Sequence, residues 1–141
     1  MNYRKHGDTY IVRLGVGDEI CASMTALAEK EKIALAEVSG ISAVNAFTVG
    51  VYDTAEKKYY ANEFSGAYEI VSLSGNITQK DGKPYLHLHF SAGDSAGRVF
   101  GGHLNSAVIS ATAEIFVRTL CGAVGRRFDE GIGLNLLDFE K

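Results

Sequence analysis

The sequence predicts an α+β domain in which a mostly antiparallel, barrel-like sheet wraps around one main helix. Segments with alternating apolar and polar residues, which are typical of strands, recur along most of the chain. Only one segment, residues 19–32, has its apolar residues at helical spacing. The 141 residues contain no linker or compositional break, so we expect a single domain over residues 1–141.

The first elements are a strand and the helix. Every second residue is apolar in residues 9–14, which predicts a strand. Asp18 is expected to be the N-cap of the helix, and Glu19 in the first turn complements the positive end of the helix dipole. The stripe expected to face the core comprises Ile20, Met24, Leu27 and Ala28.

Strands are predicted for most of the remaining chain. Odd-numbered positions are apolar from residue 107 to residue 117, and this alternation favours a strand over a helix. A glycine inside a buried strand indicates a bulge, which we expect at Gly40. The predicted strands are residues 33–44, 46–52, 57–64, 68–79, the histidine-containing segment that follows the turn at 80–83, 107–119 and 134–139, the last of which is expected to close the sheet.

Three of the four histidines fall within seventeen residues, at His87, His89 and His103. On a strand His87 and His89 point to the same side, and a hairpin at the turn sequence 93–97 can bring His103 beside them. Three histidines with one open position form a recurring zinc site. The alternative is a hydrogen-bonded or surface cluster. We expect a divalent metal site, with zinc as the ion.

Three further residues are candidates for catalysis beside such an ion. Glu69 and Glu114 could transfer protons or orient a metal ligand, and Arg98 could receive an acidic substrate. On the predicted strand 68–79, Glu69 is expected to share a face with Val71, Leu73 and Ile77. The alternative for Glu69 is a position at a strand end that still reaches water, because burying a carboxylate on an apolar face is costly. No nucleophile–base pair indicates a particular reaction.

Charge and cysteine content restrict the classes of partner. The formal net charge is −3 and the sequence pI is about 5.8, which argues against binding nucleic acid by bulk electrostatics. A local basic patch is an alternative, because Arg126 and Arg127 are adjacent. With two cysteines a hundred positions apart, no apolar leader and no apolar run of membrane-spanning length, we expect a cytoplasmic protein without a membrane partner.

Three stretches resemble the PPC (plants and prokaryotes conserved) domain, a family also catalogued as a domain of unknown function. They are Gly66-Ala67-Tyr68-Glu69 through Gly75, His87-Leu88-His89 through Gly101-Gly102-His103-Leu104, and Arg126-Arg127-Phe128 through Leu137. With the helix start at Asp18-Glu19 they span nearly the whole chain. The sequence resembles the single-domain bacterial members of this family.

The resemblance implies a compact α+β domain that assembles as a homotrimer. In plants the domain follows AT-hook motifs that bind DNA, and many bacterial members carry a DNA-binding label on that basis. This chain has no Arg-Gly-Arg-Pro hook and has three histidines that the plant domains lack. The fold is also similar to that of acetolactate decarboxylase, whose metal is held by a His-x-His pair and a later histidine.

Three functions follow as hypotheses. The first is a metal-binding protein with a small-molecule ligand, which could act as a lyase or decarboxylase on a small carbonyl acid. The second is a regulatory module that associates with DNA or with a regulatory protein. The third is an assembly domain whose histidines line a subunit interface.

Overall fold

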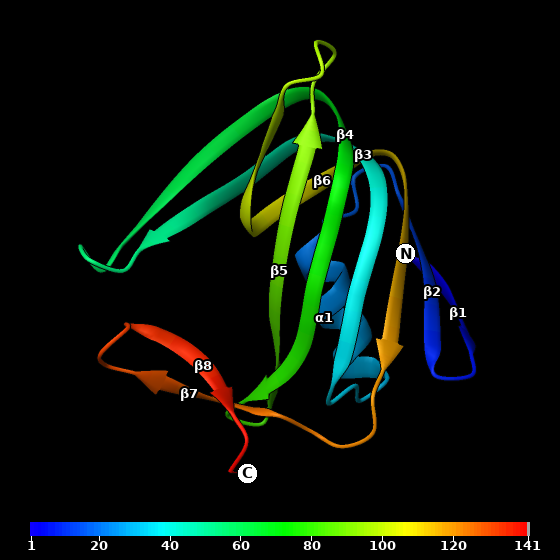
Figure 1. The fold of residues 1–141 in the computed structure, drawn as a ribbon. Coiled ribbons are helices and arrows are strands. Elements are labelled where there is room, and N and C mark those ends of the chain that lie inside the picture. Colours follow the sequence, from blue (N-terminus) through cyan, green and yellow to red (C-terminus); the bar gives the residue numbers. More distant parts are fainter. Residues whose placement is uncertain (141) are drawn as a thin grey trace.

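The computed structural model describes residues 1–140 and forms an antiparallel sheet with one short helix (Figure 1). This arrangement confirms the predicted α+β class. The elements are β1 (Asn2–His6), β2 (Thr9–Gly15), α1 (Ile20–Lys30), β3 (Ala36–Asp53), β4 (Lys58–Lys80), β5 (Lys83–Gly93), β6 (Val99–Thr119), β7 (Gly125–Asp129) and β8 (Leu134–Asp138).

The main sheet closes on itself. Its strand order is β1-β2-β6-β3-β4-β5, and β5 also pairs with β6. All of these pairs are antiparallel. The strands β7 and β8 pair only with each other, in a separate two-stranded sheet. In Figure 1 the far ends of β3 and β4 leave the body of the molecule as a hairpin arm, and the β7–β8 hairpin lies below that arm.

The helix covers one face of the sheet. Its side chains Ile20, Met24, Leu27 and Ala28 are fully buried, as predicted, and belong to one core with residues of the strands. Burying each of the larger side chains contributes about 1.5–3 kcal/mol. Figure 1 shows α1 behind β4 and β5, so the opposite face of these strands is turned away from the helix.

The helix N-cap is Glu19, so the prediction of Asp18 is wrong. The Glu19 carboxylate accepts hydrogen bonds from the amides of Cys21 (3.0 Å) and Ala22 (2.6 Å), the second and third helical positions. The same carboxylate accepts the amide of Ala107 (3.0 Å) and so joins the helix start to β6. Asp18 instead accepts from the amide of Gly15 (2.9 Å) and from the N-terminal amine (3.0 Å).

Bulges bend the long strands and change which side chains face the core. The predicted bulge at Gly40 is confirmed, because the β3–β4 register shifts between Gly40 and Ala43. A further register shift, in the β4–β5 pairing between Ile70 and Ser72, was not predicted. It buries Ile70 and leaves Glu69 exposed. The expectation that Glu69 shares a face with Leu73 and Ile77 is therefore wrong.

Several segment boundaries differ from the predictions. The predicted hairpin strands 46–52 and 57–64 are the outer parts of β3 and β4, and the 107–119 strand begins earlier, at Val99. Residues 134–139 do not close the main sheet, because β8 pairs with β7. The strands β1 and β7 were not predicted, since their sequences have no apolar alternation. Within residues 1–140 no helix has the length and apolar content needed to cross a membrane.

Candidate metal centre

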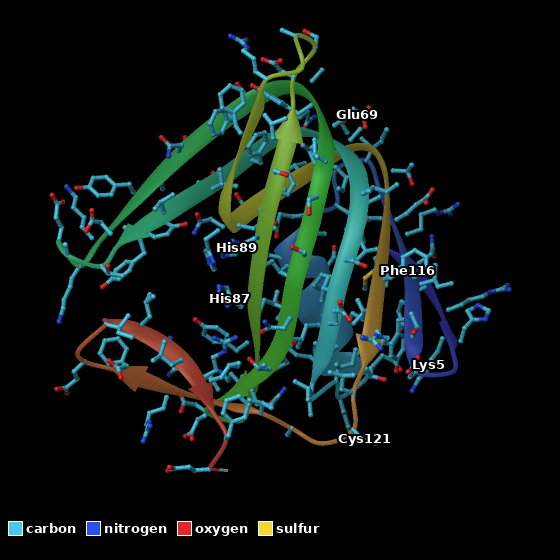
Figure 2. The ribbon with its side chains drawn as sticks, in the orientation of Figure 1. Lys5, Glu69, His87, His89, Phe116 and Cys121 are labelled. Carbon is cyan, nitrogen blue, oxygen red and sulfur yellow. The ribbon has the colours of Figure 1, made fainter. Side chains whose placement is uncertain are left out.

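The pairing of β5 with β6 brings the three histidines together. His89 lies directly opposite His103 in the antiparallel ladder. His87 lies two residues earlier on the same face of β5, opposite Asn76 of β4. Between and beyond the histidines, Leu88 and Phe90 are buried on the other face. The alternation of one strand thus separates the core from the site, and Figure 2 shows His87 and His89 on the same side of β5.

The turn between the two strands has its own stabilising contacts. The carboxylate of Asp94 accepts hydrogen bonds from the amides of Ala96 (2.9 Å) and Arg98 (3.0 Å). It also forms an ion pair with the Arg98 guanidinium at 2.7 Å. Gly102 is required beside the histidines, because a Cβ at this position would lie 2.6 Å from the carbonyl oxygen of Gly50. These contacts set the register that places His103 opposite His89.

One ring nitrogen from each histidine lies within 4.8 Å of the corresponding nitrogens of the other two. The ring centroids are 5.3 Å apart for His87–His89, 5.3 Å for His87–His103 and 5.8 Å for His89–His103. Nitrogens that share one tetrahedral zinc ion lie about 3.4 Å apart, from a Zn–N distance of about 2.1 Å. Small side-chain rotations would close the difference, so the donor set fits such an ion.

The surroundings favour the neutral form of His87 and His103. Partial burial is the main cause that lowers the pKa of His87, and the positive charge of Arg126 and the other two histidines lower it further. Burial, followed by the charge of His89, lowers the pKa of His103. Neutral imidazole has the free electron pair that a metal ligand needs.

The histidines open into a pocket of about 760 Å³. One wall is the β3–β4 arm, where the Tyr59 hydroxyl donates to the Asn105 side chain (2.6 Å) and the Tyr59 ring meets His103 edge-on at 6.2 Å. The opposite wall is the β7–β8 hairpin. The two walls touch, because Tyr52 donates to the carbonyl of Ile132 (3.1 Å) and Lys57 to that of Glu130 (2.8 Å).

Arg126 of β7 also lines this pocket, and sequence reasoning did not select it as a site residue. Its guanidinium donates to the hydroxyl of Thr78 (3.0 Å), the side-chain oxygen of Asn76 (2.9 Å) and the carbonyl of Asn135 (3.0 Å). It also lies 4.8 Å from the centroid of the Tyr85 ring. The available signals were the adjacent Arg126-Arg127 pair and its place in a stretch that resembles the PPC family.

The three candidate catalytic residues do not line the pocket. Glu69 is exposed at the bend of β4, which Figure 2 shows away from His87 and His89. Glu114 is exposed on β6, where it lies opposite Arg13 and Ile41. Arg98 is exposed in the β5–β6 turn and paired with Asp94. A catalytic role for these residues stays a prediction.

Comparisons with solved structures show close likeness over almost the whole chain. A "putative DNA-binding protein" from Bacteroides thetaiotaomicron is 31% identical, with 99% of this chain and 98% of that chain covered and a TM-score of 0.97. A metal-containing protein from Archaeoglobus fulgidus is 37% identical, with 97% and 98% covered and a TM-score of 0.88. A plant- and prokaryote-conserved (PPC) protein from Pyrococcus horikoshii is 33% identical, with 99% and 95% covered and a TM-score of 0.87.

No curated protein matches the sequence. The model of the Plants and Prokaryotes Conserved (PCC) domain, the PPC domain of the sequence analysis, matches residues 1–121. This range contains the three histidines, whereas Arg126 and the β7–β8 hairpin lie beyond it. With the family model covering most of the chain, this protein belongs to the Plants and Prokaryotes Conserved domain family.

Proposed function

We propose that this protein binds one divalent metal ion through His87, His89 and His103 and presents it to a small-molecule ligand in the adjoining pocket. The observation that carries the proposal is the convergence of three ring nitrogens within 4.8 Å. The metal-containing relative from Archaeoglobus fulgidus supports it. Residues 1–141 would work as one domain, because the pocket uses both the main sheet and the β7–β8 hairpin.

Zinc is the ion that we propose, because three neutral imidazoles with an open fourth position form a common zinc donor set. A bound zinc ion polarises a carbonyl group or lowers the pKa of a coordinated water. The chain's own residues would orient the site: Gly102 permits the close approach of β3, and Tyr59 packs against His103. The Tyr52 and Lys57 contacts described above hold the two pocket walls together.

Elemental analysis of untagged protein after zinc supplementation tests this proposal. We expect about one equivalent per chain in the wild type and less than about a tenth in His89→Ala, since a site with three ligands loses its ion when one is removed. His6→Ala is the matched control, because His6 is exposed on β1 and outside the cluster. Wild-type protein with less than a tenth of an equivalent would exclude the site.

We also propose a homotrimer, on the family resemblance and on the apolar side chains that the monomer exposes. Large exposed hydrophobic residues occur on the outer sheet face and on the β3–β4 arm, and burial in an assembly would remove them from water. They include Ile11, Ile41, Phe116, Val51, Tyr59 and Tyr60. Light scattering should give three times the 15.2 kDa chain mass. A stable monomer would refute the trimer.

Association with DNA is a second candidate, favoured by the name of the relative from Bacteroides thetaiotaomicron. The net charge of −3 and the missing hook oppose direct binding by this chain. We therefore expect a gel shift at physiological salt to show no sequence-selective binding below about 1 µM, since non-specific affinities lie near 10⁻⁴–10⁻⁶ M. Selective sub-micromolar binding would favour this second function.

A lyase or decarboxylase reaction on a small carbonyl acid, which the likeness to acetolactate decarboxylase implies, stays a prediction. Such a reaction needs a group that transfers a proton near the ion. Among residues 1–140 the pocket lining contains no aspartate or glutamate, and its hydroxyl groups belong to tyrosines. We therefore propose that the pocket binds and presents a ligand, and we assign no reaction to it.

A further inference from the structure

Arg126 places a fixed positive charge beside the histidines. The Asn76 side chain, which accepts a hydrogen bond from Arg126, belongs to the residue directly opposite His87 in the β4–β5 ladder. Side chains at directly opposite positions have Cβ atoms about 5 Å apart. The guanidinium is therefore one side chain away from the His87 ring, and its charge contributes to the lowered pKa of His87.

Within residues 1–140 the hydrogen-bond partners of Arg126 do not balance this charge. The three hydrogen-bond acceptors of Arg126 are a hydroxyl, an amide oxygen and a main-chain carbonyl, all of them neutral. No ion pair formed by residues 1–140 includes Arg126. The described lining of the pocket contains no carboxylate. A divalent ion on three neutral imidazoles would add two further positive charges, so the loaded pocket would carry a strong positive potential.

The guanidinium also keeps donors free. It has five N–H groups, of which three donate to other residues of the described range 1–140, so one N–H on each terminal nitrogen has no partner among these residues. A carboxylate accepts such a pair of parallel hydrogen bonds. The pocket lining also contains apolar side chains, among them Val51, Leu134, Leu136 and Leu137. The combination suits a ligand with an anionic end and a short hydrocarbon body.

We propose that the pocket binds a small organic acid as its anion, with the carboxylate between Arg126 and the histidine site and the hydrocarbon part against Val51 and the leucines of β8. This inference rests on the proposed metal site and names the class of ligand that this site receives. A purely structural role, in which Arg126 only ties β7–β8 to the sheet, predicts no preference for an anion.

Calorimetric titration of zinc-loaded protein with isovalerate and with its neutral isostere isovaleramide tests the inference. We expect the wild type to bind isovalerate at least tenfold more tightly than isovaleramide. Arg126→Gln should weaken isovalerate binding by about tenfold to a hundredfold, as expected for a charge-assisted hydrogen bond, and should leave isovaleramide binding unchanged. Arg127→Gln is the matched control, because Arg127 is adjacent but does not line this pocket.

The outcomes separate the two proposals. Protein that takes up no zinc overturns the proposed function and, with it, this inference. Protein that takes up zinc but binds acid and amide alike overturns this inference alone, as does undiminished isovalerate binding by folded Arg126→Gln. Should that variant not fold, Arg126→Lys keeps the charge without the planar donor pair and should retain part of the preference for isovalerate over the amide. Complete loss of the preference in Arg127→Gln would also contradict the proposal.

Discussion

Two charged side chains, Glu31 and Arg126, each attach a peripheral element to the sheet, and they differ in how their charge is balanced. Glu31 follows the helix and accepts hydrogen bonds from the hydroxyls of Tyr3 on β1 (2.6 Å) and Tyr10 on β2 (3.0 Å). These hydrogen bonds are the largest causes of the lowered pKa of Glu31, and the positive charges of Lys30 and Lys5 contribute to it. The chain thus supplies both the hydrogen bonds and the counter-charges.

Arg126 has comparable hydrogen bonding, but none of its hydrogen-bond partners among residues 1–140 carries a counter-charge. Its partners are Thr78, Asn76 and the Asn135 carbonyl, which are neutral. It also lines a pocket, whereas Glu31 lies at the junction of the helix with two strands. A charge that is balanced within its own chain can be explained by stability alone, whereas an unbalanced charge in a pocket leaves an interaction for a ligand to complete.

The largest effect on stability is expected from the core that lies behind the three histidines. Leu88→Ala should lower the free energy of unfolding by about 2–5 kcal/mol, because Leu88 is fully buried and its truncation leaves a cavity. His89→Ala, one residue away on the exposed face, should change stability by less than about 1 kcal/mol. Urea denaturation of metal-free protein measures both. Equal losses would contradict the separation of core and site on the two faces of β5.

A smaller effect is expected from removing the attachment of the β7–β8 hairpin. Arg126→Gln should lower the free energy of unfolding by about 1–3 kcal/mol, because Thr78 is buried and loses a charged partner. Amide hydrogen exchange should become faster in residues 125–138 and stay unchanged in α1. Arg127→Gln should leave both regions unchanged. Faster exchange in α1 would show that the two attachments are coupled.

The smallest effect, and one that depends on pH, is expected at Glu31. Its pKa in the folded protein is lower than its ordinary value of 4.5. Its contribution to stability is therefore present above pH 4.5 and is lost as the pH falls through the folded-state value. Thermal unfolding should show Glu31→Gln less stable than wild type at pH 7, with the difference vanishing towards acid pH. Glu29→Gln, exposed on the same helix, is the control. A difference that grows on acidification would contradict this sign.

Much of the candidate site could be predicted from the sequence, but less of its surroundings could be. The alternation of His87 and His89 with Leu88 and Phe90 could be predicted, because strand geometry is local. The hairpin that returns His103 also had a local signal, the glycine-rich turn at 93–97. Arg126 could not be placed, because its position depends on β7–β8 packing against β4 and β5, contacts between segments about fifty residues apart.

The wrong predictions for Asp18 and Glu69 share one physical origin, which is a small change in local backbone geometry. Both Asp18 and Glu19 carry a carboxylate near the helix start, and only the observed helix start at Ile20 selected Glu19 as the N-cap. Glu69 was assigned to the wrong face because a bulge between Ile70 and Ser72, which has no sequence signal, shifts the alternation. In each case a one-residue change in local geometry moved a charged group.

Four features could be predicted from the sequence alone: the family, the α+β class, the helix with its buried stripe, and the face of β5 on which two histidines lie. These depend on short-range patterns, because the periodicity of a helix or strand is set by adjacent residues. The tertiary structure was needed to show that β8 forms a wall of the histidine pocket and that the hydrogen-bond partners of Arg126 among residues 1–140 are neutral. These depend on contacts between distant segments, whose partners no local pattern specifies.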